Sequence, residues 1–359
     1  MGHGHQATLF VTGGTGFLGQ ALLPALAAAG YAVHALVRPG SLARLPQSAG
    51  LTPQPGDLLH PATYASALQG CAAVVHAAGL FRFWGPAHAF DRLNRVGTQR
   101  LAEAAVRAGV RRFVFVSTLA VIGRPLAQGV VTEATPPRPR EPYQHSKYAA
   151  ERALRRIAAR SGMEVVILRP GGFYGPGGTY GLNRLLVLDP LRGVRLQVGL
   201  GRRHIFPPVY VPDVVQGILA ALERGRAGEV YHLHDDPPTL REVNWLVGRL
   251  AGIGAWRLPA PRLGLLALAA VLEAWARLNH REPFYPLNLR HYVFPDWRAS
   301  NAKARRELGF HPTPLAEGLR AAVAWARAYL RGAPAPATSS DALAGHPWPR
   351  PGPGGPHGR

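Results

Sequence analysis

The sequence predicts an α/β fold organised around a doubly wound parallel sheet. Short apolar segments alternate with helical ones, which is typical of such sheets, and a glycine-rich turn follows the first apolar segment. Further along, Tyr143 and Lys147 are spaced four residues apart, one turn of a helix. The predicted strands lie near residues 8–12, 31–37, 51–54, 72–76, 111–117 and 164–168.

The glycine-rich turn joins the first strand to a helix. The Ala- and Leu-rich segment from Leu18 to Ala29 predicts a helix that ends at Gly30, although Pro24 opposes it and we expect a kink there. The free N–H groups at a helix start, and the close approach that glycine permits, suit a bound pyrophosphate. The spacing satisfies two phosphate-binding patterns, through Gly14, Gly16 and Gly19 or through Gly13, Gly16 and Gly19.

Tyr143 and Lys147 are candidates for acid/base chemistry. If a helix begins at Tyr143, Lys147 lies on the same face one turn later. A free phenol has a pKa of about 10, and we expect the neighbouring ammonium to favour the phenolate. The chain has only two lysines, Lys147 and Lys303, against a large number of arginines. A lysine in this setting indicates a task that suits a compact ammonium.

Seven motifs in order resemble the extended short-chain dehydrogenase/reductases, the NAD-dependent epimerase/dehydratase family. The resemblance covers residues 7 to 235 and continues weakly to 331. Within this family, the loop 81–86 and the segment 281–283 resemble those of dihydroflavonol-reductase-like and hopanoid-associated sugar-epimerase-like members. The motifs are residues 12–19, Gly56-Asp57-Leu58, His76-Ala77-Ala78-Gly79, Asn94 with Gly97-Thr98, Val116-Ser117-Thr118, Tyr143 with Lys147, and Arg169-Pro170 followed by Tyr174-Gly175-Pro176.

The resemblance implies a Rossmann-type domain and a smaller, mostly helical C-terminal substrate domain. The sheet should have about seven strands, with residues 230–233 as a late one. We expect the Rossmann domain at 1–176 and 207–236 and the substrate domain at 177–206 and 237–331. Residues 332–359 are rich in Pro and Gly without apolar periodicity, which predicts a disordered tail.

The resemblance also implies a nicotinamide cofactor, with NADP favoured over NAD. Arg38 stands at the end of the second strand, where NAD-selective sites carry an acidic residue, and Arg44 could close the same 2′-phosphate pocket. Asp57 should accept a hydrogen bond from the adenine amine. The implied cofactor-binding residues are Gly13, Thr15, Gly16, Phe17, Leu18, Gly19, Arg38, Asp57, Leu58, Ala77, Ala78, Gly79, Asn94, Ser117, Tyr143, Lys147, Pro170, Gly172 and Phe173.

By resemblance, the catalytic residues are Thr118, Tyr143 and Lys147. Thr118 would hydrogen-bond the substrate oxygen, Tyr143 would exchange its proton, and Lys147 would hold the nicotinamide ribose. Ser117 is the alternative hydroxyl if the register shifts by one residue. Several aromatic side chains after the fourth and sixth strands suit a hydrophobic or ring-shaped substrate. The predicted substrate-binding residues are Phe81, Arg82, Trp84, Thr118, Phe173 and Arg203.

These residues predict a reductase or dehydrogenase acting on a secondary alcohol or ketone, and two alternatives stay open. A nucleotide-sugar epimerase or dehydratase could use Arg202 and Arg203 to grip a phosphate, but Gly171-Gly172 stand where such enzymes commonly carry an Asn. A non-catalytic NADP-binding regulatory protein would usually lack Tyr143 or Lys147.

The composition limits the partners. The net charge is +21 at pH 7, but the arginines are scattered along predicted helices, which indicates a compositional bias and no specific nucleic-acid surface. The single Cys71 excludes an internal disulfide framework and, with a polar start that lacks a signal peptide, favours the cytoplasm. We predict no metal site, and a homodimer stays open.

One apolar segment, Leu263 to Leu272, invites a membrane interpretation. Glu273 and Arg277 interrupt it well short of the roughly 20 residues that a span needs. We expect a buried or lid helix. A peripheral helix that admits a lipid-like substrate, flanked by Arg262, Arg277 and Arg281 at a headgroup region, is the alternative.

Overall fold

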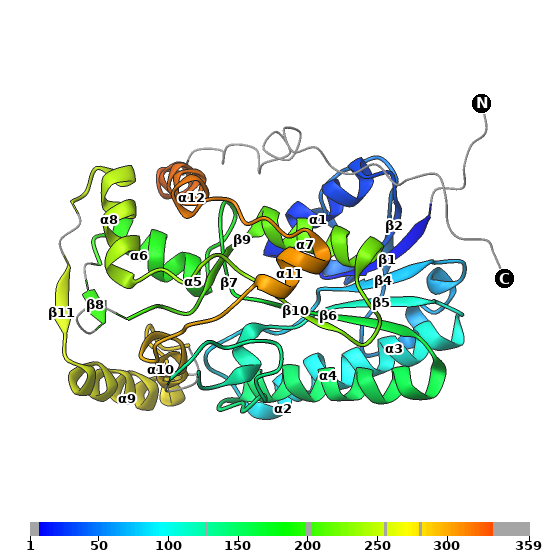
Figure 1. Cartoon of the computed structure of the whole chain (residues 1–359), viewed down its shortest axis with the longest axis horizontal. Helices are drawn as coiled ribbons and strands as arrows, with labels where there is room; N and C mark the ends of the chain where they lie inside the picture. The colour runs from blue at the N-terminus through cyan, green and yellow to red at the C-terminus, as the bar shows by residue number, and fades with distance from the viewer. Residues whose placement is uncertain are drawn as a thin grey trace.

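The computed structural model describes residues 7–125, 128–194, 196–198, 203–254, 257–279 and 282–332. Its centre is a seven-stranded, wholly parallel sheet in the order β10-β6-β5-β4-β1-β2-β3 (Figure 1). The predicted doubly wound sheet is therefore confirmed. Its strands are β1 Thr8–Thr12, β2 Ala32–Val37, β3 Leu51–Pro55, β4 Ala73–His76, β5 Arg112–Val116, β6 Glu164–Pro170 and β10 Val230–Leu233.

The strand order reverses between β1 and β4, which both pair with parallel neighbours on either side. Val11 of β1 pairs with Ala35 of β2 on one side and with Val75 of β4 on the other. Such a switch point opens a crevice at the carboxyl ends of the strands, where ligands bind in open α/β sheets. The glycine turn and the ends of β4, β5 and β6 all meet at this edge.

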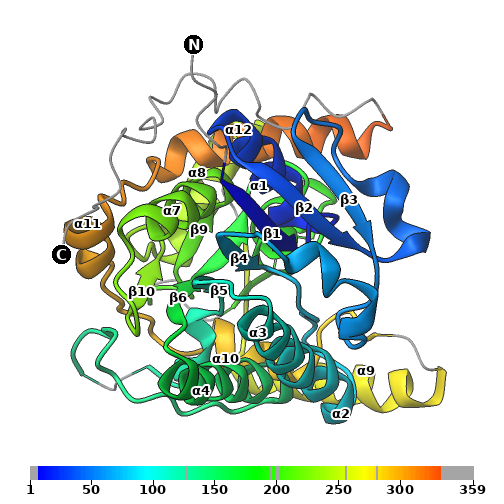
Figure 2. The same cartoon turned by 90° about the vertical axis from the view of Figure 1, so that its right-hand side faces the viewer.

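Helices cover both faces of the sheet (Figure 2). Helices α1 (Phe17–Ala28) and α7 (Val211–Arg224) pack on one face, and α3 (Gly97–Arg107) and α4 (Pro142–Ser161) pack on the other. Successive strand residues alternate between the two layers, so Leu9 and Val11 contact the first layer and Phe10 contacts the second. Because both faces are buried, most of the strands are largely apolar runs. The edge strand β3 differs, since its sequence includes Thr, Pro and Gln and none of its residues is buried.

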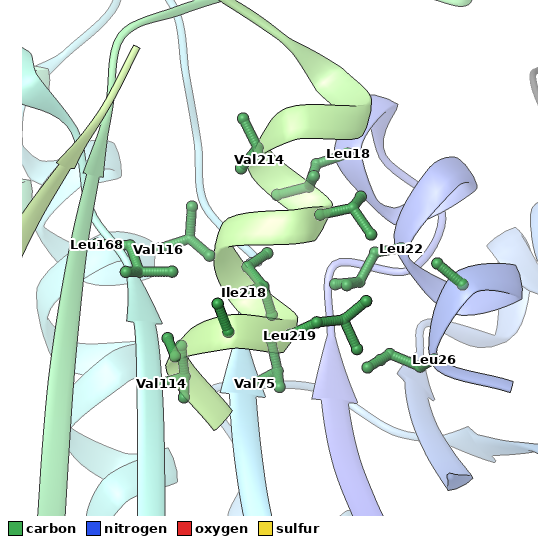
Figure 3. Packing of buried hydrophobic residues seen from close by; sticks show 14 of the residues in the cluster. Leu18, Leu22, Leu26, Val75, Val114, Val116, Leu168, Val214, Ile218 and Leu219 are labelled. Atoms are coloured by element: carbon green, nitrogen blue, oxygen red, sulfur yellow. The ribbon is translucent and has the colours of Figure 1, made fainter. Parts of the chain in front are cut away.

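The packing of the first layer is shown in Figure 3, where Leu22 and Leu26 of α1 and Ile218 of α7 meet over the sheet. These three side chains, with Val75 and Val114 beneath them, have no exposed surface. Burial of each contributes about 1.5–3 kcal/mol relative to exposure. Pro24 lies inside α1 without ending it.

Most of the remaining elements lie beside the sheet, on the left in Figure 1, and bury a core of their own, in which Val187, Val243 and Leu319 are fully covered. Two of them belong to the sheet side instead: α2 (Ala87–Phe90) lies next to α4, and α11 (Ala302–Leu308) packs against α7 and β10. The proposed domain boundaries stay a prediction, and the predicted tail lies outside the described residues except for Gly332. These elements are α2 Ala87–Phe90, β7 Gly172–Tyr174, α5 Gly181–Asn183, α6 Asp189–Leu191, β8 Leu196–Val198, β9 Pro208–Tyr210, α8 Leu240–Ala251, β11 Leu258–Ala260, α9 Arg262–Asn279, α10 Arg290–Val293, α11 Ala302–Leu308 and α12 Leu315–Leu330.

Helix α9 contains the apolar segment singled out in the sequence. Of our two expectations, a buried helix is wrong, because Leu263, Val271 and Leu278 are exposed to solvent, and a lid helix stays a prediction. Across the described parts of the chain, the structure contains no helix that combines the length and apolar character needed to cross a bilayer.

Candidate active site

A cavity of about 1120 Å³ runs from the glycine turn along the carboxyl ends of the strands to α9. Residues of the predicted cofactor set form one end of it, and the C-terminal elements form the other. Seventeen of the nineteen predicted cofactor residues lie on its wall; the other two, Gly19 and Asn94, lie behind it.

The glycine turn is closely packed against the end of β4. Gly13 has a φ of +84°, and a Cβ there would lie 2.7 Å from the backbone of Ala77. A Cβ on Gly19 would overlap the Gly13 carbonyl oxygen, so Gly19 keeps the turn and helix together from behind the wall. Gly16 is the N-cap of α1, whose first turn carries no acidic residue. The arrangement fits a pyrophosphate, because the helix N–H groups face the cavity without a competing carboxylate.

Two arginines lie at the same end of the cavity. Arg44 donates a hydrogen bond to the Thr15 carbonyl at 3.3 Å, and its own carbonyl accepts one from Gln20 at 2.6 Å, which fixes it beside the glycine turn. Arg38 lies on the wall as well, before the short helix Pro39–Arg44. The Asp57 carboxylate accepts the Leu59 N–H at 2.9 Å, and this bond, with further help from His60 and Arg38, lowers its pKa. The wall is therefore basic here, with one charged acid nearby.

Asn94 does not reach the cavity. Its side chain accepts the Leu80 N–H at 2.7 Å, donates to the Leu80 carbonyl at 3.0 Å and donates to Ser146 at 2.9 Å. It thereby ties the loop after β4 to α4. We predicted that Asn94 contacts the cofactor directly. In the structure, its side-chain oxygen and nitrogen are hydrogen-bonded to protein groups and do not line the cavity.

Helix α4 begins one residue before Tyr143. The N-cap is Glu141, whose carboxylate accepts hydrogen bonds from the Tyr143 N–H at 2.9 Å and the Gln144 N–H at 3.0 Å. An acidic N-cap satisfies two free donors and complements the positive end of the helix. The predicted helix start thus holds, and Tyr143 and Lys147 project from one face toward the cavity.

Thr118 and Tyr143 meet at the centre of the cavity. Thr118 lies two residues beyond β5 and caps the short helix Leu119–Ile122, where its hydroxyl accepts the Ala120 N–H at 3.2 Å. Its side chain also hydrogen-bonds the Tyr143 phenol. Lys147 donates to the Val116 carbonyl at 2.7 Å, and its Nζ lies 4.1 Å from the centre of the Phe115 ring. The three side chains predicted as catalytic are therefore neighbours.

The expected pKa of Tyr143 is wrong in direction. Burial raises the pKa of the phenol well above its usual value, and the hydrogen bond with Thr118 lowers it only in part. Lys147 does not stabilise a phenolate here, because its ammonium is directed at the Val116 carbonyl. Burial also lowers the pKa of Lys147 to about 7, against the opposing effect of Glu151. Loss of solvation outweighs the attraction that we inferred from spacing alone.

Ser117 is not the alternative hydroxyl. Its Oγ donates to Glu151 at 2.5 Å, and the same carboxylate receives two bonds from Arg169, at 2.7 and 3.0 Å. Glu151 and Arg169 are almost fully buried, so this ion pair fixes β5, α4 and β6 directly beneath Lys147. We did not predict Glu151, although it follows Lys147 by four residues on the same helical face.

The far half of the cavity is lined by aromatic and aliphatic side chains. The rings of Phe81 and Tyr143 are 4.9 Å apart, and Phe81 also contacts Phe83 and Tyr180. Tyr180 hydrogen-bonds Glu282, and Phe83 donates its N–H to the Tyr180 oxygen at 3.0 Å. The apolar wall, most of which sequence reasoning missed, consists of Phe81, Phe83, Tyr180, Leu182, Leu185, Leu186, Ile205, Phe206, Leu265, Leu266, Tyr285, Leu289, Tyr292 and Phe294.

Four of the six predicted substrate residues lie on the cavity wall, namely Phe81, Arg82, Thr118 and Phe173. Trp84 instead lines a separate hollow of about 340 Å³ with Pro86 and Phe90. Arg203 is exposed and absent from the cavity wall, while Arg202 and Arg281 lie outside the described residues. The loop after β4 directs Phe83 inward where we expected Trp84.

Comparison with known proteins agrees with this geometry. Residues 9–233 match the model of the NAD dependent epimerase/dehydratase family. The chain is 36% identical to a 4-hydroxy-2-methyl-3-oxo-4-farnesyl-3,4-dihydroquinoline-1-oxide ketoreductase of Stigmatella aurantiaca, over 84% of this chain and 91% of that protein. It is 31% identical to a 3 beta-hydroxysteroid dehydrogenase/Delta 5→4-isomerase of Mycobacterium tuberculosis, over 85% and 86% of the two chains.

A solved structure extends the likeness to the three-dimensional fold. DesIV, a dTDP-glucose 4,6-dehydratase from Streptomyces venezuelae solved with NAD bound, superposes with a TM-score of 0.71 at 29% identity, covering 90% of this chain and 98% of that one. The family match spans most of the chain and includes the glycine turn, the end of β5 and the Tyr143/Lys147 pair. The chain therefore belongs to the NAD-dependent epimerase/dehydratase family and is an NAD-dependent oxidoreductase of the extended short-chain dehydrogenase/reductase type.

Proposed function

We propose that this enzyme transfers hydride between NADP and a secondary alcohol or ketone on a large apolar substrate. The observation that carries the proposal is the apolar half of the cavity, which continues from the Tyr143 phenol to α9. A wall in which aromatic and aliphatic side chains predominate suits a prenyl, alkyl or polycyclic substrate. The farnesyl and steroid substrates named for the two relatives support this class.

The roles of the three central residues follow from their positions. The bound nicotinamide supplies or accepts the hydride. The raised pKa of Tyr143 keeps the phenol protonated at neutral pH, so it can donate a proton to a carbonyl oxygen during reduction. Thr118, already bonded to the phenol, orients the same oxygen. Lys147 lies one helical turn after Tyr143, with its ammonium next to the end of β5. From there the ammonium would hold the ribose hydroxyls of the nicotinamide half of the cofactor.

Arg38 and Arg44 support NADP over NAD. Both lie on the cavity wall beside the glycine turn, where the adenosine ribose of a dinucleotide lies in this fold. Guanidinium groups bind a phosphate with two parallel hydrogen bonds, whereas the 2′-hydroxyl of NAD calls for an acceptor. The nearby Asp57 has its carboxylate engaged by Leu59, which leaves the arginines to select the cofactor.

A nucleotide-sugar epimerase is the second candidate, favoured by the likeness to DesIV and by Arg257 and Arg290 on the cavity wall. Its support is weaker than expected from the sequence, because Arg203 lies away from the cavity. A non-catalytic binder is disfavoured, since Thr118, Tyr143 and Lys147 are all present and adjacent.

The test is turnover of NADPH by the full chain with a 3-ketosteroid, a long-chain ketone and dTDP-glucose, with Tyr143→Phe as the background. We expect oxidation of NADPH with the two apolar ketones and no conversion of dTDP-glucose to another sugar nucleotide. Turnover of the sugar nucleotide alone would contradict the proposal and favour the epimerase or dehydratase.

A further inference from the structure

Helix α9 presents an outer face without a single polar side chain. Its exposed residues other than Arg262 and Arg277 are all apolar or glycine. The exposed fraction is 80% for Leu263, 67% for Val271, 64% for Trp275 and 82% for Leu278. The remaining members of this outer face are Gly264, Ala267, Leu268, Ala270 and Ala274.

This face lies at the edge of the molecule. In Figures 1 and 2, α9 lies along part of the lower margin, and no described element is drawn beneath it. A surface helix of a globular protein normally carries charged residues on the side away from the core. Exposed apolar patches of this size mark a surface that meets another apolar phase. Leu258, four residues before the helix, and Phe284, five residues after it, are exposed as well.

The inner face of the same helix forms part of the cavity wall. Leu265, Leu266 and Ala269 line the cavity, and Ala269 is buried. One helix therefore separates the cavity from the apolar outer face. Glu273, the only acidic residue of α9, is turned inward, where it accepts the Leu287 N–H at 3.1 Å and pairs with Arg277 at 3.2 Å.

We propose that α9 docks the protein on the surface of an anionic bilayer. The helix would lie in the plane of the membrane with its outer face at the boundary of headgroups and acyl chains, as amphipathic interfacial helices do. Arg262 and Arg277 border this face near its two ends, at the level of anionic headgroups, and the net charge of +21 adds attraction. The position of α9 also gives a bilayer-dissolved substrate a short route to the cavity.

A second copy of the chain fits this face less well than a bilayer does. A two-fold contact would run two copies of α9 antiparallel and bring Arg262 of one copy near Arg277 of the other. Glu273 pairs with Arg277 of its own chain and so lessens this repulsion, but the net charge of +21 on each copy still opposes the association of two copies. Charge complementarity thus favours an anionic lipid surface.

The experiment is co-sedimentation of the full chain with vesicles of phosphatidylcholine, with and without phosphatidylglycerol. Val271→Glu with Leu278→Glu should weaken binding to the anionic vesicles by roughly a hundredfold, about tenfold for each apolar side chain replaced. The matched control is Val130→Glu with Leu330→Glu, the same substitutions at exposed positions elsewhere on the chain. It adds the same charge and should bind nearly as well as the native chain.

Trp275 provides a second readout that needs no enzymatic activity. Lipids brominated in their acyl chains should quench part of the tryptophan fluorescence, and Trp275→Phe should remove most of that quenching. Trp245→Phe is the control, since Trp245 is also exposed but lies on α8. Neither assay uses the proposed substrate. The docking proposal can therefore fail while the proposed function holds, and the proposed function can fail while the docking proposal holds.

Three results would overturn the proposal. The first is absence of binding of the native chain to anionic vesicles. The second is equal loss of binding in the two double variants, which would leave only a charge effect. The third is a native dimer in sedimentation that the α9 double variant dissociates, which would assign the face to a second copy.

Discussion

The Tyr292 hydroxyl donates a hydrogen bond to the Glu141 carboxylate at 2.9 Å. Glu141 caps the helix that carries Tyr143 and Lys147, and Tyr292 belongs to α10 and lines the cavity. Both residues are buried. The Glu141 carboxylate thereby joins the start of α4 to α10 in the C-terminal half of the chain. It connects the side of the cavity that carries Tyr143 to the side that carries Tyr292.

Tyr292→Phe should lower the free energy of unfolding by about 1–3 kcal/mol, because it leaves a buried carboxylate oxygen with one donor fewer. Turnover should fall severalfold while NADPH affinity stays, since the glycine turn is distant in the cavity. Thermal melts and a cofactor titration measure the two effects. Tyr285→Phe, which removes another hydroxyl from the same wall, is the control and should change neither the free energy of unfolding nor turnover.

Gly13→Ala should abolish cofactor binding and destabilise the protein. The new Cβ would lie 2.7 Å from the Ala77 backbone and would require a φ of +84°, which costs an alanine about 1–2 kcal/mol in strain alone. Gly40→Ala, where a Cβ meets nothing within 4 Å, should be neutral. Calorimetric titration with NADPH checks both, and normal binding by Gly13→Ala would refute the assignment of this turn.

Arg38→Asp should weaken NADP binding by roughly 10- to 100-fold, the equivalent of losing one charge-assisted bond to a phosphate. NAD binding should be spared or improved, because a carboxylate can accept from the 2′-hydroxyl and repels the 2′-phosphate. Fluorescence titration of the two cofactors measures the ratio. A native preference for NAD would contradict the proposed role of Arg38 and Arg44.

The sequence predicted best where local pattern determines structure. The inner strands follow from apolar runs, since both faces of the sheet are buried there, and the Tyr143/Lys147 pair follows from helical spacing. The glycine turn is likewise set by close backbone packing at Gly13 and Gly19.

Prediction failed where the orientation or the pKa of a side chain depends on residues that are distant in the sequence. Phe83 and not Trp84 faces the cavity, because Phe83 packs against Tyr180 and Tyr292, which are far away in sequence. The pKa of Tyr143 depends on burial that no spacing reveals. The composition of α9 predicts a core helix, and only the fold shows that none of the described residues covers its outer face.

The pH dependence of reduction should report Lys147. Its pKa of about 7 in the folded chain lies below the ordinary value, so the ammonium is present below pH 7 and is lost as the pH rises through it. We therefore expect kcat/KM for reduction to decline above about pH 7, because this ratio reports ionisation in the free enzyme. Lys147→Arg, which stays charged, should show weak but pH-independent activity over the same range. A native profile that is flat through this range would contradict the assignment.

The proposed chemistry depends most directly on Tyr143. Tyr143→Phe removes only the phenolic oxygen, so the ring contact with Phe81 and the fold should persist. Turnover should fall by about 10²- to 10⁴-fold, as is usual when a positioned acid is lost, and NADPH affinity should change little. Steady-state kinetics and a cofactor titration of the same variant separate the two effects.

Lys147→Ala should reduce turnover and cofactor affinity together, because it removes the proposed ribose contact as well as the buried ammonium that bonds the Val116 carbonyl next to Tyr143. Lys147→Arg should not restore full activity, since a planar guanidinium cannot replace a compact ammonium that is almost fully buried and bonded to the Val116 carbonyl. If the residues act as a unit, the double variant Tyr143→Phe/Lys147→Ala should be scarcely slower than the slower single variant. Losses that multiply would mean independent roles, and native turnover in Tyr143→Phe would show that the proton comes from another group.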